Sequence, residues 1–135
     1  MNKNITDEQL VKAAEAAMKY AYSPYSDFKV GAAILTTDGN VFTGCNIENA
    51  SYGATICAER TAAVKAVSEG HPEFLKIAIV SSFGEYTYPC GICRQFLSEF
   101  FRDDGILIIN DKQNGIKTIK FFDMIPNSFS GESLH

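Results

Sequence analysis

Several features that would place this chain in a specialised class of protein are scarce or missing. Only four of the 135 residues are cysteine, too few for a disulfide-stabilised scaffold. No apolar run approaches the roughly 20 residues that a membrane-spanning helix requires, and residues 1–10 lack the apolar stretch of a secretion signal. Internal repeats and linkers are missing as well. We therefore expect a soluble, cytoplasmic protein that forms a single domain over residues 1–135.

Positively charged residues are outnumbered. The 12 Lys and Arg residues stand against 16 Asp and Glu residues, which gives a formal net charge of −4. A protein that follows the phosphates of polymeric nucleic acid needs a basic surface, so editing of RNA or DNA is disfavoured. We expect a small-molecule substrate, and neither a nucleic-acid partner nor a membrane partner.

The pattern of apolar residues divides the chain into alternating helices and strands. Thr6-Asp7-Glu8-Gln9 has the form of a capping box and opens a helix that we expect to run to about residue 22. Alternating apolar residues on both sides of Asp38-Gly39 predict a β-hairpin with strands at residues 28–34 and 41–47.

The second half of the chain continues this alternation. We expect, in order, an alanine-rich helix at residues 57–67, a strand at 75–81, a helix from 89 or 90 that ends before Gly105 with Phe96, Leu97 and Phe100 buried, a strand at 106–110, a strand or short helix at 117–122, and an irregular tail from 125. This order predicts an α/β fold, a three-layer α/β/α domain with a mixed sheet of about five strands.

Three cysteines and one glutamate point to metal chemistry. Glu59 stands two residues after Cys57, and a Pro-Cys-Gly-Ile-Cys segment later supplies Cys90 and Cys93. Three thiolates leave a tetrahedral zinc ion one open position for water, whereas a structural zinc site normally has four protein ligands. Zinc deaminases use this arrangement, with a glutamate outside the metal shell as general acid and base. We therefore predict that Cys57, Cys90 and Cys93 bind one zinc ion and that Glu59 is catalytic.

The fourth cysteine keeps a competing interpretation open. A lone C-x-x-C segment can be half of a structural zinc site, a redox pair or two buried thiols. With Cys45 as a fourth ligand, the site would be closed and the protein would be a noncatalytic zinc-binding module. Cys45 falls in the expected strand at residues 41–47, however, where a lone cysteine usually acts as a small hydrophobic residue.

Both cysteine segments are expected at helix N-termini, where backbone N–H groups and the helix dipole favour thiolates. Three thiolates on a dication leave a net charge of −1, which makes a bound water less acidic than three neutral imidazoles would. Arg60 directly follows Glu59, and Arg94 directly follows Cys93. We expect one or both arginines to donate hydrogen bonds to sulfur and so to withdraw charge from the metal.

Four segments together resemble the small, homotetrameric cytidine deaminases. They are Phe-Lys-Val-Gly-Ala-Ala at residues 28–33, Asn-Ile-Glu-Asn-Ala-Ser-Tyr at 46–52, Cys-Ala-Glu-Arg-Thr-Ala at 57–62 and Pro-Cys-Gly-Ile-Cys-Arg-Gln at 89–95. The resemblance extends from about residue 13 to about residue 129. One departure is Cys57, where many deaminases of nucleotides and nucleic acids have histidine, and this favours the free-nucleoside branch.

The resemblance implies a reaction. The chain would be a zinc-dependent hydrolase of pyrimidine salvage that converts cytidine and deoxycytidine to uridine and deoxyuridine with release of ammonia. Glu59 would take a proton from zinc-bound water, and the hydroxide would add to the amino-bearing carbon of cytosine. Glu59 would then deliver protons to the ring nitrogen and the departing amino group.

The resemblance also implies which residues contact the substrate. Asn46 and Glu48 would hydrogen-bond the ribose hydroxyls, Phe28 would pack against the pyrimidine ring and Ala58 would contact the substrate. Tyr52 and Phe129 would reach the pocket of a neighbouring subunit in a homotetramer with one zinc ion per subunit.

An enzymatic alternative shares the zinc and glutamate signature, namely a deaminase of a cytosine nucleoside antibiotic such as blasticidin S. Asn46 and Glu48 in their Asn-Ile-Glu-Asn setting favour ordinary ribose instead. His71 and His135 are given no functional role.

Overall fold

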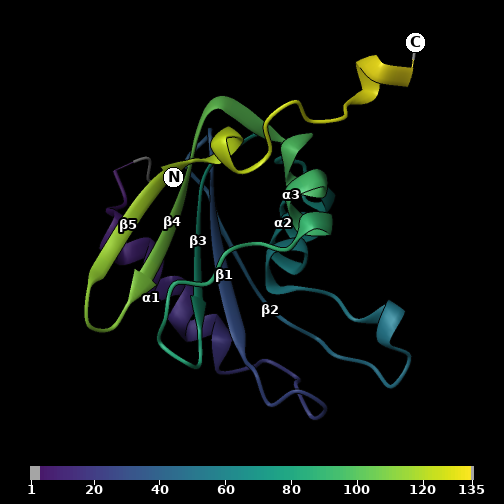
Figure 1. The fold of residues 1–135 in the computed structure, drawn as a ribbon. Coiled ribbons are helices and arrows are strands. Elements are labelled where there is room, and N and C mark those ends of the chain that lie inside the picture. Colours follow the sequence, from purple (N-terminus) through teal and green to yellow (C-terminus); the bar gives the residue numbers. More distant parts are fainter. Residues whose placement is uncertain (1–3, 135) are drawn as a thin grey trace.

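The computed structural model describes residues 4–134, so His135 lies outside the described residues. A five-stranded mixed sheet in the order β2-β1-β3-β4-β5 forms its centre (Figure 1). β3 and β4 are parallel, and the other neighbouring strands are antiparallel. The strands are β1 (Val30–Thr36), β2 (Val41–Cys45), β3 (Phe74–Ser81), β4 (Phe101–Asp111) and β5 (Gly115–Lys120).

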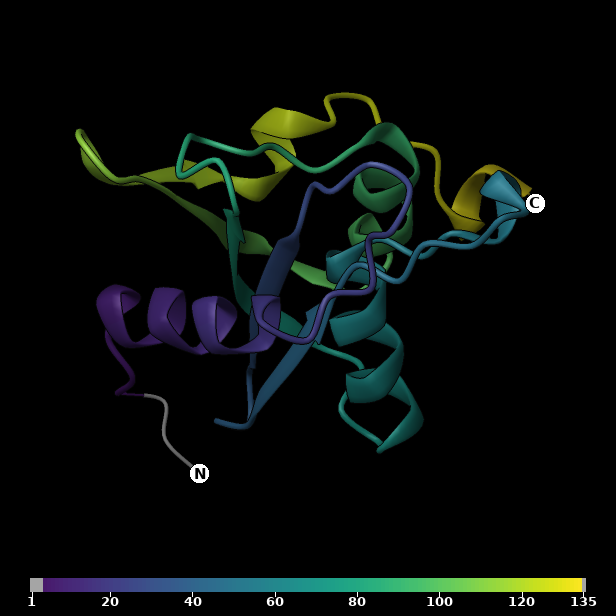
Figure 2. The ribbon, with the colours of Figure 1, turned by 90° about the horizontal axis from the view of Figure 1, so that it is seen from below.

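Helices cover both faces of this sheet, which confirms the expected three-layer α/β/α fold. α1 (Asp7–Met18) lies on one side, and α2 (Ala58–Ser68) and α3 (Gly91–Ser98) lie on the other, as Figure 2 shows. Every residue of β1 is buried because both of its faces are covered. Within the described part of the chain, no helix is long and apolar enough to cross a membrane.

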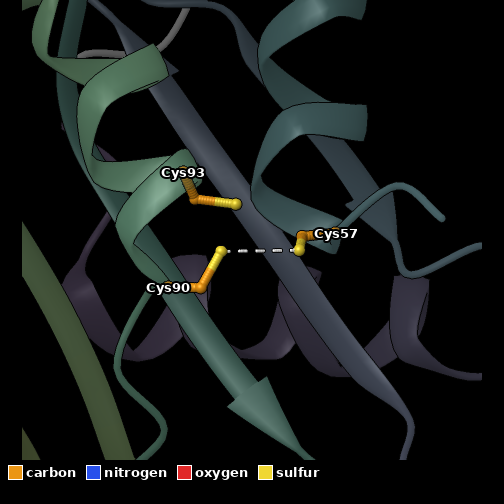
Figure 3. Close-up of side chains that lie close together, drawn as sticks. All are labelled: Cys57, Cys90 and Cys93. Atoms are coloured by element: carbon orange, nitrogen blue, oxygen red, sulfur yellow. Dashed lines mark hydrogen bonds between the residues drawn. The ribbon is translucent and has the colours of Figure 1, made fainter. Parts of the chain in front are cut away.

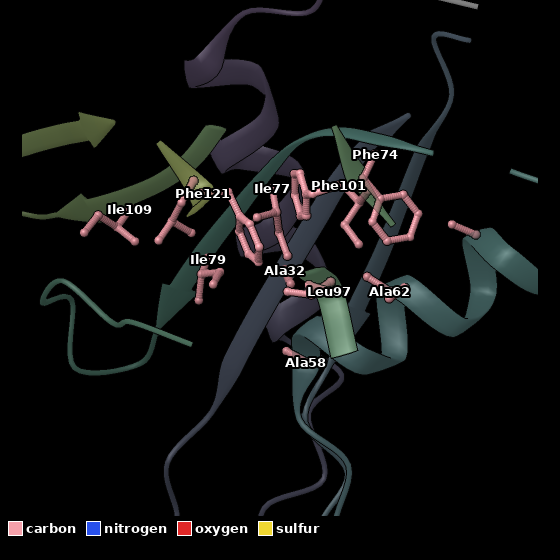
Figure 4. Packing of buried hydrophobic residues seen from close by; sticks show 14 of the residues in the cluster. Ala32, Ala58, Ala62, Phe74, Ile77, Ile79, Leu97, Phe101, Ile109 and Phe121 are labelled. Atoms are coloured by element: carbon pink, nitrogen blue, oxygen red, sulfur yellow. The ribbon is translucent and has the colours of Figure 1, made fainter. Parts of the chain in front are cut away.

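Side-chain alternation along the strands divides the core into two layers. On the α1 side, Leu10 and Ala14 pack against Leu35 of β1 and Val80 of β3. On the opposite side, the alanines of α2 and Leu97 of α3 pack against the isoleucines of β3 and against a set of phenylalanines (Figure 4). α2 and α3 both pack against this second layer. The packing therefore fixes the positions of their N-termini.

Two glycines allow the helices to approach the sheet closely. A Cβ atom on Gly31 would lie 2.0 Å from the carbonyl oxygen of Ala14 in α1. A Cβ atom on Gly44 would lie 2.5 Å from the nitrogen of Ala62 and 2.7 Å from the carbonyl oxygen of Ala58. Any larger residue at position 44 would therefore push α2 away from β2.

The first helix begins as predicted but ends earlier. Thr6 and Gln9 form the capping box. The backbone N–H of Gln9 donates to the Thr6 hydroxyl at 3.1 Å, and the backbone N–H of Thr6 donates to the Gln9 side-chain oxygen at 2.9 Å. The expected end at about residue 22 is wrong, because α1 ends at Met18 and Tyr22 pairs with another segment. Its N–H donates to the carbonyl of Asn46 at 2.9 Å, and its carbonyl accepts from the N–H of Glu48 at 2.8 Å.

The segment after α3 also differs from the expectation. The helix ends at Ser98 and β4 already begins at Phe101, so Phe100 lies beyond the helix, although it still packs against the core. Phe74 pairs with Phe101 and Lys76 with Ile106, which leaves a bulge in β4. The ring of Phe101 stacks on Phe121 with centroids 4.3 Å apart, and this packing holds the early start of the strand.

The end of the chain combines both options left open for residues 117–122. β5 occupies Gly115–Lys120, and the 3₁₀ helix η2 follows at Phe121–Met124. The tail that follows is irregular as expected, apart from the short 3₁₀ helix η3 at Gly131–Leu134.

Candidate active site

The two cysteine segments meet where α2 and α3 begin (Figure 3). Cys57 is the N-cap residue of α2, Cys90 is the N-cap residue of α3, and Cys93 lies in the first turn of α3. Their three sulfur atoms lie within 4.8 Å of one another, and those of Cys57 and Cys90 are 3.8 Å apart. Zinc–sulfur bonds of about 2.3 Å place the sulfur atoms of a tetrahedral site about 3.8 Å apart. The three residues therefore fit one zinc ion.

Cys45 is not part of this group of sulfur atoms. It ends β2, pairs with Gly31 of β1, and lines a separate groove with Ala13, Tyr20 and Lys65. Burial raises the pKa of its thiol, as for a cysteine that packs rather than ligates. The closed four-cysteine site is therefore not formed in the described structure.

The surroundings of the cysteines favour the thiolate form of Cys57, which is the form that binds a cation. A hydrogen bond with Cys93, assisted by Arg60 and Cys90, lowers the pKa of Cys57 to about 5 despite its partial burial. The same contact with Cys57, together with burial and the charge of Glu59, raises the pKa of Cys93. Because zinc binds thiolates, metal binding would displace the proton that the raised pKa favours on Cys93.

The two arginines have different roles. One Nη atom of Arg60 lies 3.8 Å from the sulfur of Cys57 and 3.3 Å from the carbonyl oxygen of Thr55. Arg94 instead donates to two carbonyl oxygens, those of Pro89 at 2.7 Å and Met124 at 2.9 Å. Arg60 is thus placed to withdraw charge from a thiolate, whereas Arg94 ties the start of α3 to the segment after β5.

Glu59 lies in the first turn of α2 and is buried, with a relative exposure of 4%. Burial raises the pKa of its carboxyl group to about 7, and the neighbouring charge of Cys57 acts in the same direction. A carboxyl group with a pKa near neutrality can both accept and donate a proton at the pH of the cell. This is the property that a general acid and base requires.

A cavity of about 200 Å³ brings half of the predicted site residues together. Its walls include five residues named from the sequence besides Glu59, namely Cys57, Cys90, Phe28, Asn46 and Ala58. Sequence reasoning missed four other lining residues, which are Val30, Thr55, Thr87 and Tyr88. Thr87 and Tyr88 directly precede Pro89-Cys90, and this position was the one available signal for them.

Glu48 lines an adjoining cavity of about 240 Å³ with Tyr25, Ser26 and Tyr52. Thr55 lines both cavities, so the two are neighbours. The Glu48 carboxylate accepts the backbone N–H groups of Tyr25 at 3.0 Å and Ser26 at 3.1 Å. The structure therefore places a fixed carboxylate beside the cavity that holds Glu59.

The amide of Asn46 is largely occupied within the protein. Its oxygen accepts the N–H of Val30 at 2.9 Å, and its nitrogen donates to the carbonyl oxygen of Phe28 at 2.8 Å. These two bonds fix the orientation of the amide and leave one N–H for a ligand. Asn46 thus braces the segment that carries Phe28.

Tyr52 and Phe129 do not line the cavity that holds Glu59. Tyr52 is 77% exposed with its ring 6.2 Å from that of Tyr25, and Phe129 is 56% exposed. The carbonyl of Phe129 accepts a hydrogen bond from Gln95 of α3 at 2.8 Å, which holds the tail near the metal-binding helix. Both rings are left available to another chain.

Residues 4–108 match the model of the family described as the cytidine and deoxycytidylate deaminase zinc-binding region. The chain belongs to this family. The match and the three-cysteine cluster together fit one zinc ion per chain.

The chain is similar to named members of the family over most of its length. It is 44% identical over 128 residues to the cytidine deaminase of Halalkalibacterium halodurans, covering 95% of this chain and 97% of that one. It is also 44% identical over 128 residues to the probable cytidine deaminase of Dictyostelium discoideum, covering 94% and 86%. The solved cytidine deaminase structure from Burkholderia pseudomallei has a TM-score of 0.86 at 42% identity, covering 93% of this chain and 100% of that one.

Proposed function

We propose that the chain deaminates cytidine and deoxycytidine by hydrolysis, giving uridine or deoxyuridine and ammonia. One observation carries this proposal: the buried carboxyl group of Glu59 shares a cavity with Cys57 and Cys90, two members of a three-sulfur cluster that fits zinc. The similarity to the cytidine deaminases of other organisms supports the choice of substrate.

Cys57, Cys90 and Cys93 would hold the zinc ion. When bound, zinc supplies a Lewis acid that makes water a nucleophile at neutral pH. Glu59 accepts the two protons of the attacking water one after the other, passing the first to the pyrimidine ring nitrogen and the second to the departing amino group. Water thereby replaces the amino group of cytosine by oxygen, and ammonia leaves.

The substrate would span the two adjoining cavities. In the first, the ring of Phe28 forms a wall for the pyrimidine beside Ala58 and Glu59. In the second, Glu48 offers a carboxylate to the ribose hydroxyls, and the free N–H of Asn46 assists between them. The residues described around both cavities include no Lys or Arg, while Glu48 contributes a negative charge. This disfavours a 5′-phosphate and favours a free nucleoside.

We further propose that the protein acts as a cytoplasmic homotetramer in pyrimidine salvage, with residues 1–135 as one domain per subunit. The exposure of Tyr52 and Phe129 supports this assembly, since large exposed rings near a site are typical of surfaces that bind another chain. Sedimentation of the zinc-loaded protein tests it, because a monomer would contradict the proposal.

The decisive test is an ultraviolet assay of the zinc-loaded protein with cytidine, deoxycytidine, deoxycytidylate, blasticidin S and a cytosine-containing oligonucleotide in parallel. We expect turnover of the two nucleosides and little or none of the other three. The matched control is Glu59→Gln, which keeps the shape of the side chain and should retain zinc while losing about 10²- to 10⁴-fold in rate. Equal activity of Glu59→Gln and the parent, or turnover confined to blasticidin S, would refute the proposal.

A further inference from the structure

The loop between α1 and β1 places one hydroxyl between the sugar-binding and base-binding sides of the site. Ser26 is exposed on this loop, two residues before Phe28. Its hydroxyl donates to the carboxylate of Glu48 and accepts the backbone N–H of Phe28 at 3.0 Å. A single oxygen atom therefore connects a residue proposed to bind ribose with one proposed to bind the pyrimidine.

The carboxylate of Glu48 depends strongly on this loop. One of its oxygens accepts two backbone N–H groups, those of Tyr25 at 3.0 Å and Ser26 at 3.1 Å, and the other accepts the Ser26 hydroxyl. The Ser26 hydroxyl, with these backbone groups, lowers the pKa of Glu48, so the carboxylate is held ionised. A carboxylate has about four acceptor positions. Three donors therefore orient it and still leave an acceptor position for a ligand hydroxyl.

Phe28 is held from both ends of its backbone. Its N–H donates to the Ser26 hydroxyl at 3.0 Å, and its carbonyl accepts from the Asn46 amide at 2.8 Å. Between Ser26 and Phe28, Asp27 has a φ of 56°, a left-handed conformation that turns the chain sharply. A short turn thus sets the position of the Phe28 ring in the cavity. The Ser26 hydroxyl links this turn to the side chain of Glu48.

We propose that Ser26 is a positioning residue that couples sugar recognition by Glu48 to base recognition by Phe28. This inference rests on the proposed function and deepens it. Removing the hydroxyl frees one oxygen of Glu48 and the backbone N–H of Phe28 at the same time. The loss falls on binding of the whole nucleoside, with little effect on the proton transfers of Glu59, which lies on α2.

The test compares Ser26→Ala with Ser26→Thr, which keeps the hydroxyl, and with Ser68→Ala as a control. Ser68 is also exposed and its hydroxyl also hydrogen-bonds, but to the carbonyl oxygen of Lys65 at the end of α2. Two quantities are measured for each protein: the KM and kcat for cytidine, and the inhibition constant of 2′,3′-dideoxycytidine, which lacks the hydroxyls that Glu48 would bind.

We expect Ser26→Ala to raise the KM for cytidine roughly tenfold while kcat stays within about twofold, since a lost hydrogen bond to a charged group weakens substrate and transition state alike. The inhibition constant of dideoxycytidine should rise about fourfold, less than the KM, because the loosened Phe28 weakens binding of the base although no sugar hydroxyl is involved. Ser26→Thr and Ser68→Ala should stay within about twofold of the parent in all three quantities. An unchanged KM in Ser26→Ala, an unchanged inhibition constant of dideoxycytidine, or an equal loss of affinity for cytidine and dideoxycytidine would overturn the coupling.

Amide hydrogen exchange separates this inference from the proposed function. In Ser26→Ala the N–H of Phe28 loses its acceptor and should exchange about tenfold faster, whereas Ser26→Thr should protect it like the parent. Unchanged protection in Ser26→Ala would refute the role of Ser26 whether or not the protein turns over cytidine. An inactive parent would instead refute the proposed function, and the exchange result would still decide whether Ser26 anchors Phe28.

Discussion

The two halves of the site are built in different ways. The metal-binding half stands on the first turns of α2 and α3, which rest on a packed layer of alanine, isoleucine and phenylalanine side chains. The half that we propose binds the nucleoside, called the nucleoside-binding half, is assembled from loop segments around residues 25–28, 46–55 and 87–88. Hydrogen bonds hold its loops around Ser26 and Asn46. The first half is therefore rigid through packing, and the second depends on individual polar contacts.

This difference assigns distinct consequences to substitutions in each half. Changes to the metal-binding half should affect metal retention and folding together, because ligands and core share the same helices. Changes to the nucleoside-binding half should affect substrate affinity while leaving the fold intact.

Cys90→Ala should have the largest effect. Two remaining thiolates cannot hold zinc as three do, so we expect the metal to be lost on dialysis against a chelator and activity to be abolished. The measurement is zinc content per chain together with deamination of cytidine. Cys45→Ala is the matched control and should keep zinc and activity, because Cys45 lies outside the sulfur cluster. Zinc loss from Cys45→Ala would revive the noncatalytic module with four cysteine ligands.

Gly44→Ala should damage the metal-binding half without touching a ligand. The added Cβ atom would meet backbone atoms of Ala58 and Ala62 at 2.7 and 2.5 Å, so α2 must shift with Cys57 at its N-terminus. We expect a loss of about 1–3 kcal/mol in the free energy of unfolding, measured with denaturant, and weaker zinc retention. Gly53→Ala is the control, since nothing lies within 4 Å of its added Cβ atom. Equal free energies of unfolding for both variants would show that α2 accommodates the added Cβ atom without a loss of stability.

Phe83→Ala should affect the nucleoside-binding half alone. The Phe83 ring is 68% exposed, yet its centroid lies 4.8 Å from that of Phe28. An aromatic pair of this kind contributes about 0.5–1.5 kcal/mol, so we expect the KM for cytidine to rise about 2- to 12-fold with kcat and zinc content unchanged. Phe83→Tyr, which keeps the ring, should behave like the parent. A fall in zinc content of Phe83→Ala would contradict the independence of the two halves.

Asp38→Asn lies outside both halves and should have the smallest effect. The hydroxyl of Thr36, with the side chains of His71 and Asn40, lowers the pKa of Asp38 from 3.8 to about 2. Because this pKa is lower in the folded protein, the stabilisation is present above pH 3.8 and is lost as the pH falls through about 2. Thermal unfolding should show the parent slightly more stable than Asp38→Asn at neutral pH, and the two converging near pH 2.

Two measurements check the role assigned to Asp38. Deamination of cytidine at pH 7 should be the same in Asp38→Asn and the parent, since the hairpin turn lies away from the residues that line the site. A stability difference that grows towards low pH would contradict the assignment, because the sign of the pKa shift requires it to shrink.

Local patterns were sufficient for the elements and for the metal-binding half. The capping box at Thr6 and the alternation around Asp38-Gly39 predicted α1 and the β1–β2 hairpin, because caps and turns are set by neighbouring residues. Cys57 and Cys90 proved to be N-cap residues for the same reason. The end of α1 at Met18 was missed, because Tyr22 pairs with residues far along the chain.

The sequence by itself determined the layers, the two helix starts that carry the cysteines, and the presence of a carboxylate beside them, since these follow from periodicity and spacing. Only the tertiary structure decided that three sulfur atoms converge while Cys45 stays apart, and that Arg60 faces sulfur while Arg94 binds carbonyl groups. It also decided that Ser26 joins Glu48 to Phe28. The cysteine cluster, the bond from Arg94 to Met124 and the bond from Ser26 to Glu48 join segments that lie at least 22 residues apart. Their geometry is set by how α2, α3 and the loops pack on one sheet.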